Sequence, residues 1–251
     1  MTEDRVIWRL SGRDVTSFLQ GVVSNDVLPL DRAPGIVWAA LLTPQGKYLA
    51  DFFVVNRPQD AAGALLIDIP ADLAADTQRR LLMYRLRADV QIHDAGLYLE
   101  RGIGAPPEGA QPDPRHPALP WRRYVDLPAA AFDDRALRVE HLVPAYPEDL
   151  RPDESYILEA GFERLHGVDF RKGCYVGQEV TARMKHKTEL RKGLVRLAIA
   201  GEAAPGTPIT LADGREAGVL GTVWDGRALA HMRFDRMAEP LLAGGAQLAA
   251  E

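Results

Sequence analysis

The chain has 251 residues, 47% of them hydrophobic and 26% charged, and a formal net charge of -5. This length allows one large domain or two to three small ones, and the composition is typical of a globular protein. No stretch approaches the ~20 apolar residues of a membrane-spanning helix, and the acidic start MTEDRVIWRL does not resemble a secretory signal. The single cysteine allows no intrachain disulfide and no conventional zinc site, and it is typical of the reducing cytoplasm, where we expect the protein.

Up to about residue 101, alternating apolar residues predict β-strands, and two stretches have helical spacing. The expected strands are 6–10, 36–42, 47–56, 64–69, 89–93 and 97–101. One helix begins at Ser11 and the other spans about 71–87. The first helix should bury four apolar residues at helical spacing, Val15, Phe18, Leu19 and Val22. This order indicates an α+β domain with an antiparallel sheet.

The second half of the chain begins with a loop and ends with a run of short strands. Residues 102–120 contain six prolines and three glycines, which predicts an irregular loop. A strand at 121–127 and a helix at 128–137 follow, and 138–143 is ambiguous. The last part has five β-like runs, 193–200, 207–212, 218–224, 227–234 and 247–249. We therefore expect a larger domain at 1–190 and a small β-barrel at 191–251, which at about 60 residues is marginal alone.

The only cysteine, Cys174, lies in the segment RKGCYVGQEVTARMKHK at 171–187. Gly173 and Gly177 allow tight turns on both sides of it, and residues 178–186 have the pattern of a short helix. Neighbouring cations and a helix N-terminus both favour the thiolate, which is the reactive form. The sequence thus predicts an activated cysteine, and the alternative is a small buried apolar residue.

Charge is distributed unevenly around this cysteine. Residues 164–196 carry nine Lys or Arg against three acidic residues, a net +6, so the remainder of the chain carries −11. Such a basic region could receive an anionic ligand or an acidic partner, or it could be a solvated surface. We do not expect direct nucleic-acid binding, because the chain is acidic overall and few aromatic residues accompany the basic ones.

The string KGCYVGQEVTAR resembles the signature K-G-C-[FY]-x-G-Q-E-x-x-x-R of the YgfZ family. Members of that family are folate-binding-type proteins that assist iron–sulfur cluster assembly and, through it, tRNA modification. They are similar to the T-protein of glycine cleavage, a tetrahydrofolate-dependent aminomethyltransferase. The resemblance covers most of the chain from Ser11 to Arg196. It implies two interleaved α+β subdomains with antiparallel sheet, followed by a small C-terminal β-barrel.

The resemblance also implies roles for individual residues. Cys174 would be the reactive thiol or a transient cluster ligand, and Arg171, Lys172 and Arg183 would keep it ionised. The other motif residues would support the loop: Gly173, Tyr175, Gly177, Gln178 and Glu179. A cluster would need further thiolates from another molecule, because four are usual. The expected partners are iron–sulfur recipient or carrier proteins.

Four residues would contact folate in this comparison: Asn25, Asp51, Glu140 and Glu159. The segments SGRD…FLQ…NDV at 11–27 and TPQGK…D at 43–51 resemble the T-protein group, as do ALRVEH…VP and YILEAGFERL. Glu140 could instead be an exposed strand residue, and Glu159 a charge on the surface of a helix. The expected cofactor is tetrahydrofolate or a derivative.

Two functions follow from the resemblance, and we prefer the first. The chain would be an accessory factor for iron–sulfur proteins, with no enzymatic turnover of its own. The alternative is a folate-dependent one-carbon transferase, but the acidic pair of the T-protein hairpin is here Ala50-Asp51, so one carboxylate is missing. A Cys–His nucleophile with His166 or His186 as base is a further option that lacks an orienting third group.

Overall fold

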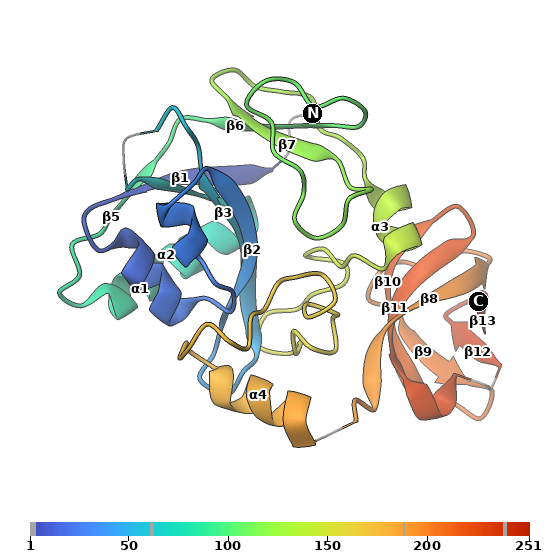
Figure 1. Cartoon of the computed structure of the whole chain (residues 1–251). Helices are drawn as coiled ribbons and strands as arrows, with labels where there is room; N and C mark the ends of the chain where they lie inside the picture. The colour runs from blue at the N-terminus through green and yellow to red at the C-terminus, as the bar shows by residue number, and fades with distance from the viewer. Residues whose placement is uncertain (1–3, 61–62, 188, 238–239) are drawn as a thin grey trace. The chain divides into compact units, whose positions relative to one another are not determined.

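The computed structural model describes residues 4–60, 63–187, 189–237 and 240–251 (Figure 1). Contacts divide the chain into two compact units, each made of two segments. Unit 1 is Met1–Phe132 with Glu163–Glu179, and unit 2 is Asp133–Phe162 with Val180–Glu251. None of the helices in the described residues is long and apolar enough to cross a membrane.

Unit 1 is built on a five-stranded antiparallel sheet with the strand order β2-β3-β4-β1-β5. The strands are β1 (Arg5–Ser11), β2 (Gly35–Leu42), β3 (Tyr48–Asn56), β4 (Leu65–Pro70) and β5 (Gln91–Asp94). The central strands β3 and β4 are buried along almost their whole length, as expected for strands covered on both faces. The helix α2 (Ala71–Arg85) packs on this sheet and α1 (Val15–Val22) packs against α2, while β6 (Tyr98–Gly102) and β7 (Trp121–Val125) form a separate antiparallel pair (Figure 1).

The first helix buries Val15, Phe18, Leu19 and Val22, as the spacing predicted. Its start was predicted wrongly, because the helix begins at Val15 and not at Ser11. The Asp14 carboxylate makes no capping bond and instead accepts a hydrogen bond from the Asp89 backbone N–H at 2.8 Å. A contact across 75 residues therefore takes the side chain that local rules assign to the cap.

Residues 102–120 run without helix, and without strand beyond Gly102, as predicted. They are nevertheless held in place by buried charges. Asp113 pairs with Arg115 at 2.7 Å, and the Arg115 guanidinium lies 5.0 Å from the centre of the Phe53 ring. Arg122 in β7 pairs with the fully buried Asp68 of β4 and lies 3.6 Å from Asp113. A proline-rich segment is thus anchored by an ionic network that composition alone does not show.

Asp68 is the centre of this network. Arg5 and Arg122 both pair with its carboxylate, and the Tyr124 hydroxyl donates to Oδ2 at 2.9 Å. Burial raises the pKa of Asp68, but the two guanidiniums outweigh burial and lower it to about 2. The carboxylate is therefore ionised at neutral pH and joins β1, β4 and β7.

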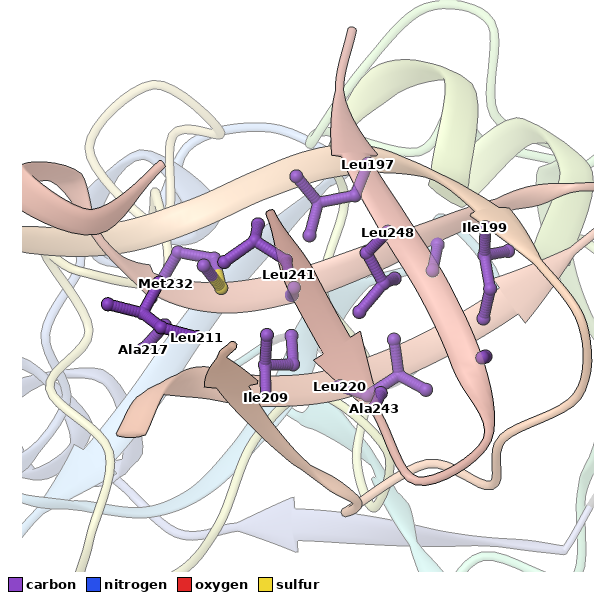
Figure 2. Packing of buried hydrophobic residues seen from close by; sticks show 13 residues of the cluster. Leu197, Ile199, Ile209, Leu211, Ala217, Leu220, Met232, Leu241, Ala243 and Leu248 are labelled. Atoms are coloured by element: carbon purple, nitrogen blue, oxygen red, sulfur yellow. The ribbon is translucent and has the colours of Figure 1, made fainter. Parts of the chain in front are cut away.

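Unit 2 is dominated by a closed antiparallel barrel with the strand order β10-β11-β8-β13-β12-β9. Its strands are β8 (Lys192–Ala200), β9 (Pro208–Leu211), β10 (Glu216–Trp224), β11 (Arg227–Arg233), β12 (Leu241–Ala243) and β13 (Ala246–Ala250). Figure 2 shows apolar side chains filling its interior, among them Leu197, Leu220, Met232, Leu241 and Leu248. Five of the six strands were predicted, whereas β12 was missed because three residues show no period. The α+β fold with a C-terminal barrel is confirmed.

The helix predicted at 128–137 is displaced, and α3 spans Arg135–His141. Asp133 closes a turn just before it, because its carboxylate accepts from the Arg135 backbone N–H at 3.1 Å. Arg138 then fixes the helix: it is buried and donates to Asp134 at 3.1 Å and to Thr222 Oγ1 of β10 at 3.1 Å. Glu140, considered as a strand residue, lies in this helix. The last helix, α4 (Gln178–Lys187), is close to the predicted 178–186.

Candidate functional site

Cys174 is exposed on a short loop in unit 1. The loop ends where α4 begins at Gln178, whose backbone N–H donates to the Tyr175 carbonyl at 3.2 Å. Tyr175, next to the cysteine, is only 6% exposed. The residue that carries the thiol is therefore in solvent, while the side chain that follows it is packed inside. The alternative of a buried apolar cysteine does not hold.

The two glycines of the loop have different surroundings. Gly173 has φ +94°, and no atom lies within 4 Å of the position that a Cβ would take there. Gly177 has φ +83°, and the Thr43 carbonyl oxygen is 2.5 Å from the corresponding position. Both backbone conformations favour glycine. Only Gly177 also needs the absence of a side chain, because the loop there lies against the turn between β2 and β3.

A polar seam joins the segment before Cys174 to the connection that follows α1. Ser24 Oγ donates to the Gly167 carbonyl at 2.6 Å, and the Ser24 carbonyl accepts from the Asp169 N–H at 3.1 Å. Asn25 Nδ2 donates to the His166 carbonyl at 2.6 Å and to the Trp38 carbonyl at 2.8 Å. Residues that are about 140 apart in sequence thereby hold one another in place.

Lys172 adds two hydrogen bonds to this polar seam. Its ammonium donates to the Gln20 and Val23 carbonyls, each at 2.6 Å, and lies 4.9 Å from the centre of the Tyr175 ring. Burial lowers the pKa of Lys172 to about 8, while Asp26 and Asp169 act in the opposite direction. The neighbouring Arg171 has a side chain that is 92% exposed and pairs only loosely with Asp169, at 3.5 Å.

The other motif residues lie on α4 or at its start. Gln178 is half-buried at the first position of the helix, and Glu179 and Arg183 are exposed one turn apart. The predicted supporting roles of Gly173, Tyr175, Gly177, Gln178, Glu179 and Arg183 stay predictions, as does the reactivity of Cys174. In the described part of the chain, no hydrogen bond joins the Cys174 thiol to His166 or His186, so nothing here favours a Cys–His nucleophile.

Asp51, on β3, is buried and has both carboxylate oxygens occupied by neutral donors. Trp38 Nε1 donates to Oδ2 at 2.8 Å, and the Tyr48 hydroxyl donates to Oδ1 at 2.7 Å. Among the described residues no Lys or Arg lies within ion-pair distance of this carboxylate. Asn25, also predicted to bind folate, donates both amide N–H groups to backbone carbonyls, and its oxygen already accepts from the Asp26 backbone N–H at 2.9 Å, so a ligand would have to share that oxygen.

The two predicted carboxylates of unit 2 differ in setting. Glu140, on α3, is exposed and accepts from Arg227 at 2.7 Å, which is a surface ion pair. Glu159 lies in a turn region rather than on a helix, and its carboxylate is 2.9 Å from His231 Nε2 of β11. The Glu159–His231 pair lines a cavity of about 210 Å³, whose wall also includes Glu148, Asp149, Tyr156 and Lys192.

Sequence reasoning missed the residues that hold the cysteine loop. Gln20 and Ser24 belong to the segment that resembles the T-protein group, but their contacts with Lys172 and Gly167 were not foreseen. Their positions in the FLQ…SND stretch, just past a helical stripe, are the only local signal. In the residues that the structure describes, no three His, Cys, Asp or Glu side chains gather as a metal site.

Comparison with known proteins supports the resemblance. Residues 191–251 match the family model described as CAF17, C-terminal beta-barrel domain. The chain is 35% identical over 231 residues to the mitochondrial iron–sulfur cluster assembly factor IBA57 homolog of Mycosarcoma maydis, covering 80% of this chain and 57% of that protein. It is 26% identical over 281 residues to mitochondrial IBA57 of Mus musculus, covering 95% of this chain and 78% of that protein.

The fold is shared with a solved enzyme structure. The glycine cleavage system aminomethyltransferase T from Bartonella henselae superposes with a TM-score of 0.77 at 12% identity, covering all of this chain and 84% of that one. The predicted T-protein-like fold is thus confirmed, and in sequence the chain is similar to the IBA57 proteins. The chain spans a little over half the length of the first two relatives that it matches, 57% and 55%.

The predicted cytoplasmic location is wrong by this comparison, because the relatives are mitochondrial proteins. The prediction rested on the single cysteine. Lack of a disulfide indicates a reducing environment, which does not distinguish the cytoplasm from other reducing compartments.

Proposed function

We propose that this chain, similar to the IBA57 assembly factors, is an accessory factor for the assembly or maintenance of iron–sulfur proteins, including enzymes that modify tRNA. The observation that carries the proposal is the exposed thiol of Cys174 on a loop whose neighbours are fixed. An iron–sulfur cluster is the cargo here, and four thiolates usually hold one. With a single cysteine, this chain would supply one ligand, and the partner would supply the others.

The chemistry asked of Cys174 is ligand exchange. Its thiolate would form a bond to one iron while a thiolate of the carrier leaves that iron, and the reverse step would release the cluster to the recipient. Charge is conserved, because one thiolate replaces another. The exposed position suits this role, since the partner's ligands must come within bonding distance of the same iron.

The test is support of cluster-dependent enzymes in cells that rely on this chain. Replacing Cys174 with serine changes one atom and should reduce the activity of two such enzymes to the level of cells without the protein. An enzyme that needs no cluster serves as the control, and thermal unfolding should show that the variant is folded. If Cys174→Ser supports these cluster-dependent enzymes as well as the wild-type protein does, the proposal is wrong.

A folate-type ligand is the second part of the proposal. Asp51 supports it, because its buried carboxylate has no cationic partner, and each oxygen has a second lone pair beside its bond to Trp38 or Tyr48 that can accept from a pterin ring. Asn25, Glu140 and Glu159 remain proposed contacts. Calorimetric titration with tetrahydrofolate should show binding that Asp51→Asn weakens about tenfold or more, because hydrogen bonds to a charged group contribute about 1.5–3 kcal/mol. Absence of any heat with the wild-type protein would remove the folate site.

The alternative function is a folate-dependent one-carbon transferase. The shared fold with an aminomethyltransferase favours it. However, Asp51 is preceded by Ala50, so the second carboxylate of the T-protein pair is missing. Turnover of methylene-tetrahydrofolate by the purified chain would support this alternative over the accessory role.

A further inference from the structure

Lys172 is hydrogen-bonded to the end of α1 through both its side chain and its backbone carbonyl. The ammonium donates to the carbonyls of Gln20 and Val23, which lie in the last turn of α1 and at its C-cap. Carbonyls at a helix C-terminus lack partners within the helix and carry its negative partial charge, so a cation is favourable there. A second hydrogen bond joins the same two residues, because Gln20 Nε2 donates to the Lys172 carbonyl at 3.2 Å.

On the other side of the cysteine, packing fixes the chain again. Tyr175 is buried, with its ring 4.9 Å from the same ammonium, and its carbonyl accepts from the Gln178 N–H. Between these two fixed residues lie only Gly173 and Cys174, both exposed. The thiol is therefore presented on a two-residue span with an anchored residue at each end.

We infer that Lys172 is a positioning residue, which holds the Cys174 loop against the C-terminal end of α1 so that the thiol is presented in one place. This inference rests on the proposed function for its biological meaning, but the anchoring itself is a property of the chain alone. It differs from the role expected from sequence, in which Lys172 acts through its charge on the thiolate. Two of its three N–H groups are engaged by carbonyls, which is the arrangement of an anchor.

Arg171 provides a matched control. It is also a cation and is one residue closer to the N-terminus, but its side chain is 92% exposed and makes no contact with α1. If charge near Cys174 is what matters, Lys172→Met and Arg171→Met should behave alike. If anchoring matters, only Lys172→Met should have an effect.

The first measurement is hydrogen exchange of the backbone amides from 169 to 178 in the full chain. We expect Lys172→Met to speed the exchange of these amides about tenfold or more through local opening, and Arg171→Met to leave it unchanged. Equal exchange in wild type and Lys172→Met would overturn the inference, as would an equal increase in the two variants. Should Lys172→Met fail to fold, Lys172→Gln is the milder form of the same test, with the same increase expected.

The second measurement is the rate of alkylation of the only thiol by iodoacetamide as a function of pH. An anchor predicts that Lys172→Met changes the apparent pKa of the thiol no more than Arg171→Met does. A larger rise of that pKa in Lys172→Met, with unchanged exchange, would mean that the lysine acts through charge, and the inference would be lost.

The third measurement links position to function. Lys172→Met should lower support of cluster-dependent enzymes, while Arg171→Met should retain it. Full support from Lys172→Met despite a loosened loop would overturn the positioning role. Failure of Cys174→Ser to reduce support would remove the proposed function but leave the anchoring to be decided by exchange and alkylation.

Discussion

Replacing Gly177 with alanine adds a Cβ atom that would lie 2.5 Å from the Thr43 carbonyl oxygen and 2.9 Å from Leu42 Cβ. The backbone there has φ +83°, which costs an L-residue about 1–2 kcal/mol. The close neighbours belong to the backbone and to a fully buried side chain, so neither can rotate away, and overpacking of this kind costs a further ~1–3 kcal/mol. We expect Gly177→Ala to destabilise unit 1 by about 2–5 kcal/mol in total.

Gly173→Ala is the matched control, because its φ is +94° and nothing lies within 4 Å of the added Cβ. It should lose only the conformational part, about 1–2 kcal/mol. Urea unfolding followed by tryptophan fluorescence measures both, and three of the four tryptophans, Trp8, Trp38 and Trp121, lie in unit 1.

The difference in unfolding free energy between Gly177→Ala and Gly173→Ala tests the packing argument. Close packing against the turn at Thr43 predicts that Gly177→Ala is the more harmful by about 1–3 kcal/mol. It should also lower support of cluster-dependent enzymes more than Gly173→Ala does, because the loop must move to admit the methyl group. Equal losses for the two variants would refute the packing argument and leave only backbone conformation.

Two further predictions test the ionic network of unit 1 and the packing of unit 2. Asp68, with a pKa lowered to about 2, adds stability that is fully present above about pH 4 and is lost as the pH falls toward 2, up to about 2 kcal/mol. Asp68→Asn should remove this acid-dependent part and destabilise unit 1 by about 3–5 kcal/mol, since the buried guanidinium of Arg122 and the half-buried one of Arg5 lose their partner; a wild-type slope of unfolding free energy against pH would contradict this. In unit 2, Gly221→Ala would place Cβ 2.1 Å from Asp149 Oδ1 and should lower the melting temperature, whereas Gly245→Ala, with no atom within 4 Å, should not. Similar melting temperatures for the two would contradict the packing seen at Asp149.

The parts of the fold that sequence predicted are those set by neighbours in the chain. The α1 stripe and most barrel strands follow from the period of their apolar residues, and both were found. The glycine turns of the cysteine loop are also local. In contrast, α3 was misplaced because Arg138 makes its decisive contacts with Thr222 and Asp149, 84 and 11 residues away. Alanine-rich spacing before Asp133 favoured a helix that these contacts override.

In the candidate site, too, features set by neighbouring residues could be predicted, and features set by distant residues could not. Exposure of Cys174 between two glycines could be predicted, because it depends on consecutive residues. The hydrogen bonds that hold those residues against the end of α1 could not be predicted, because Lys172 contacts Gln20 and Val23 across 152 and 149 positions of the sequence. The resemblance implied that the charge of Lys172 keeps the thiol ionised. In the structure, the Lys172 ammonium donates hydrogen bonds to two backbone carbonyls.

Anchoring of the loop also bears on how one thiol could serve the proposed cargo, an iron–sulfur cluster that four thiolates usually hold. A cluster shared between two molecules requires ligands from both to reach the same irons, and each ordered loop adds to the entropy lost on association. A loop that Lys172 and Tyr175 already hold has less freedom to lose, so more of the binding free energy remains for the complex. Under the proposed function, the single exposed cysteine would suit release for a related reason: only one iron–thiolate bond to this chain would break when the recipient offers its own ligand. A rigid loop with one ligand would thus favour transfer over storage.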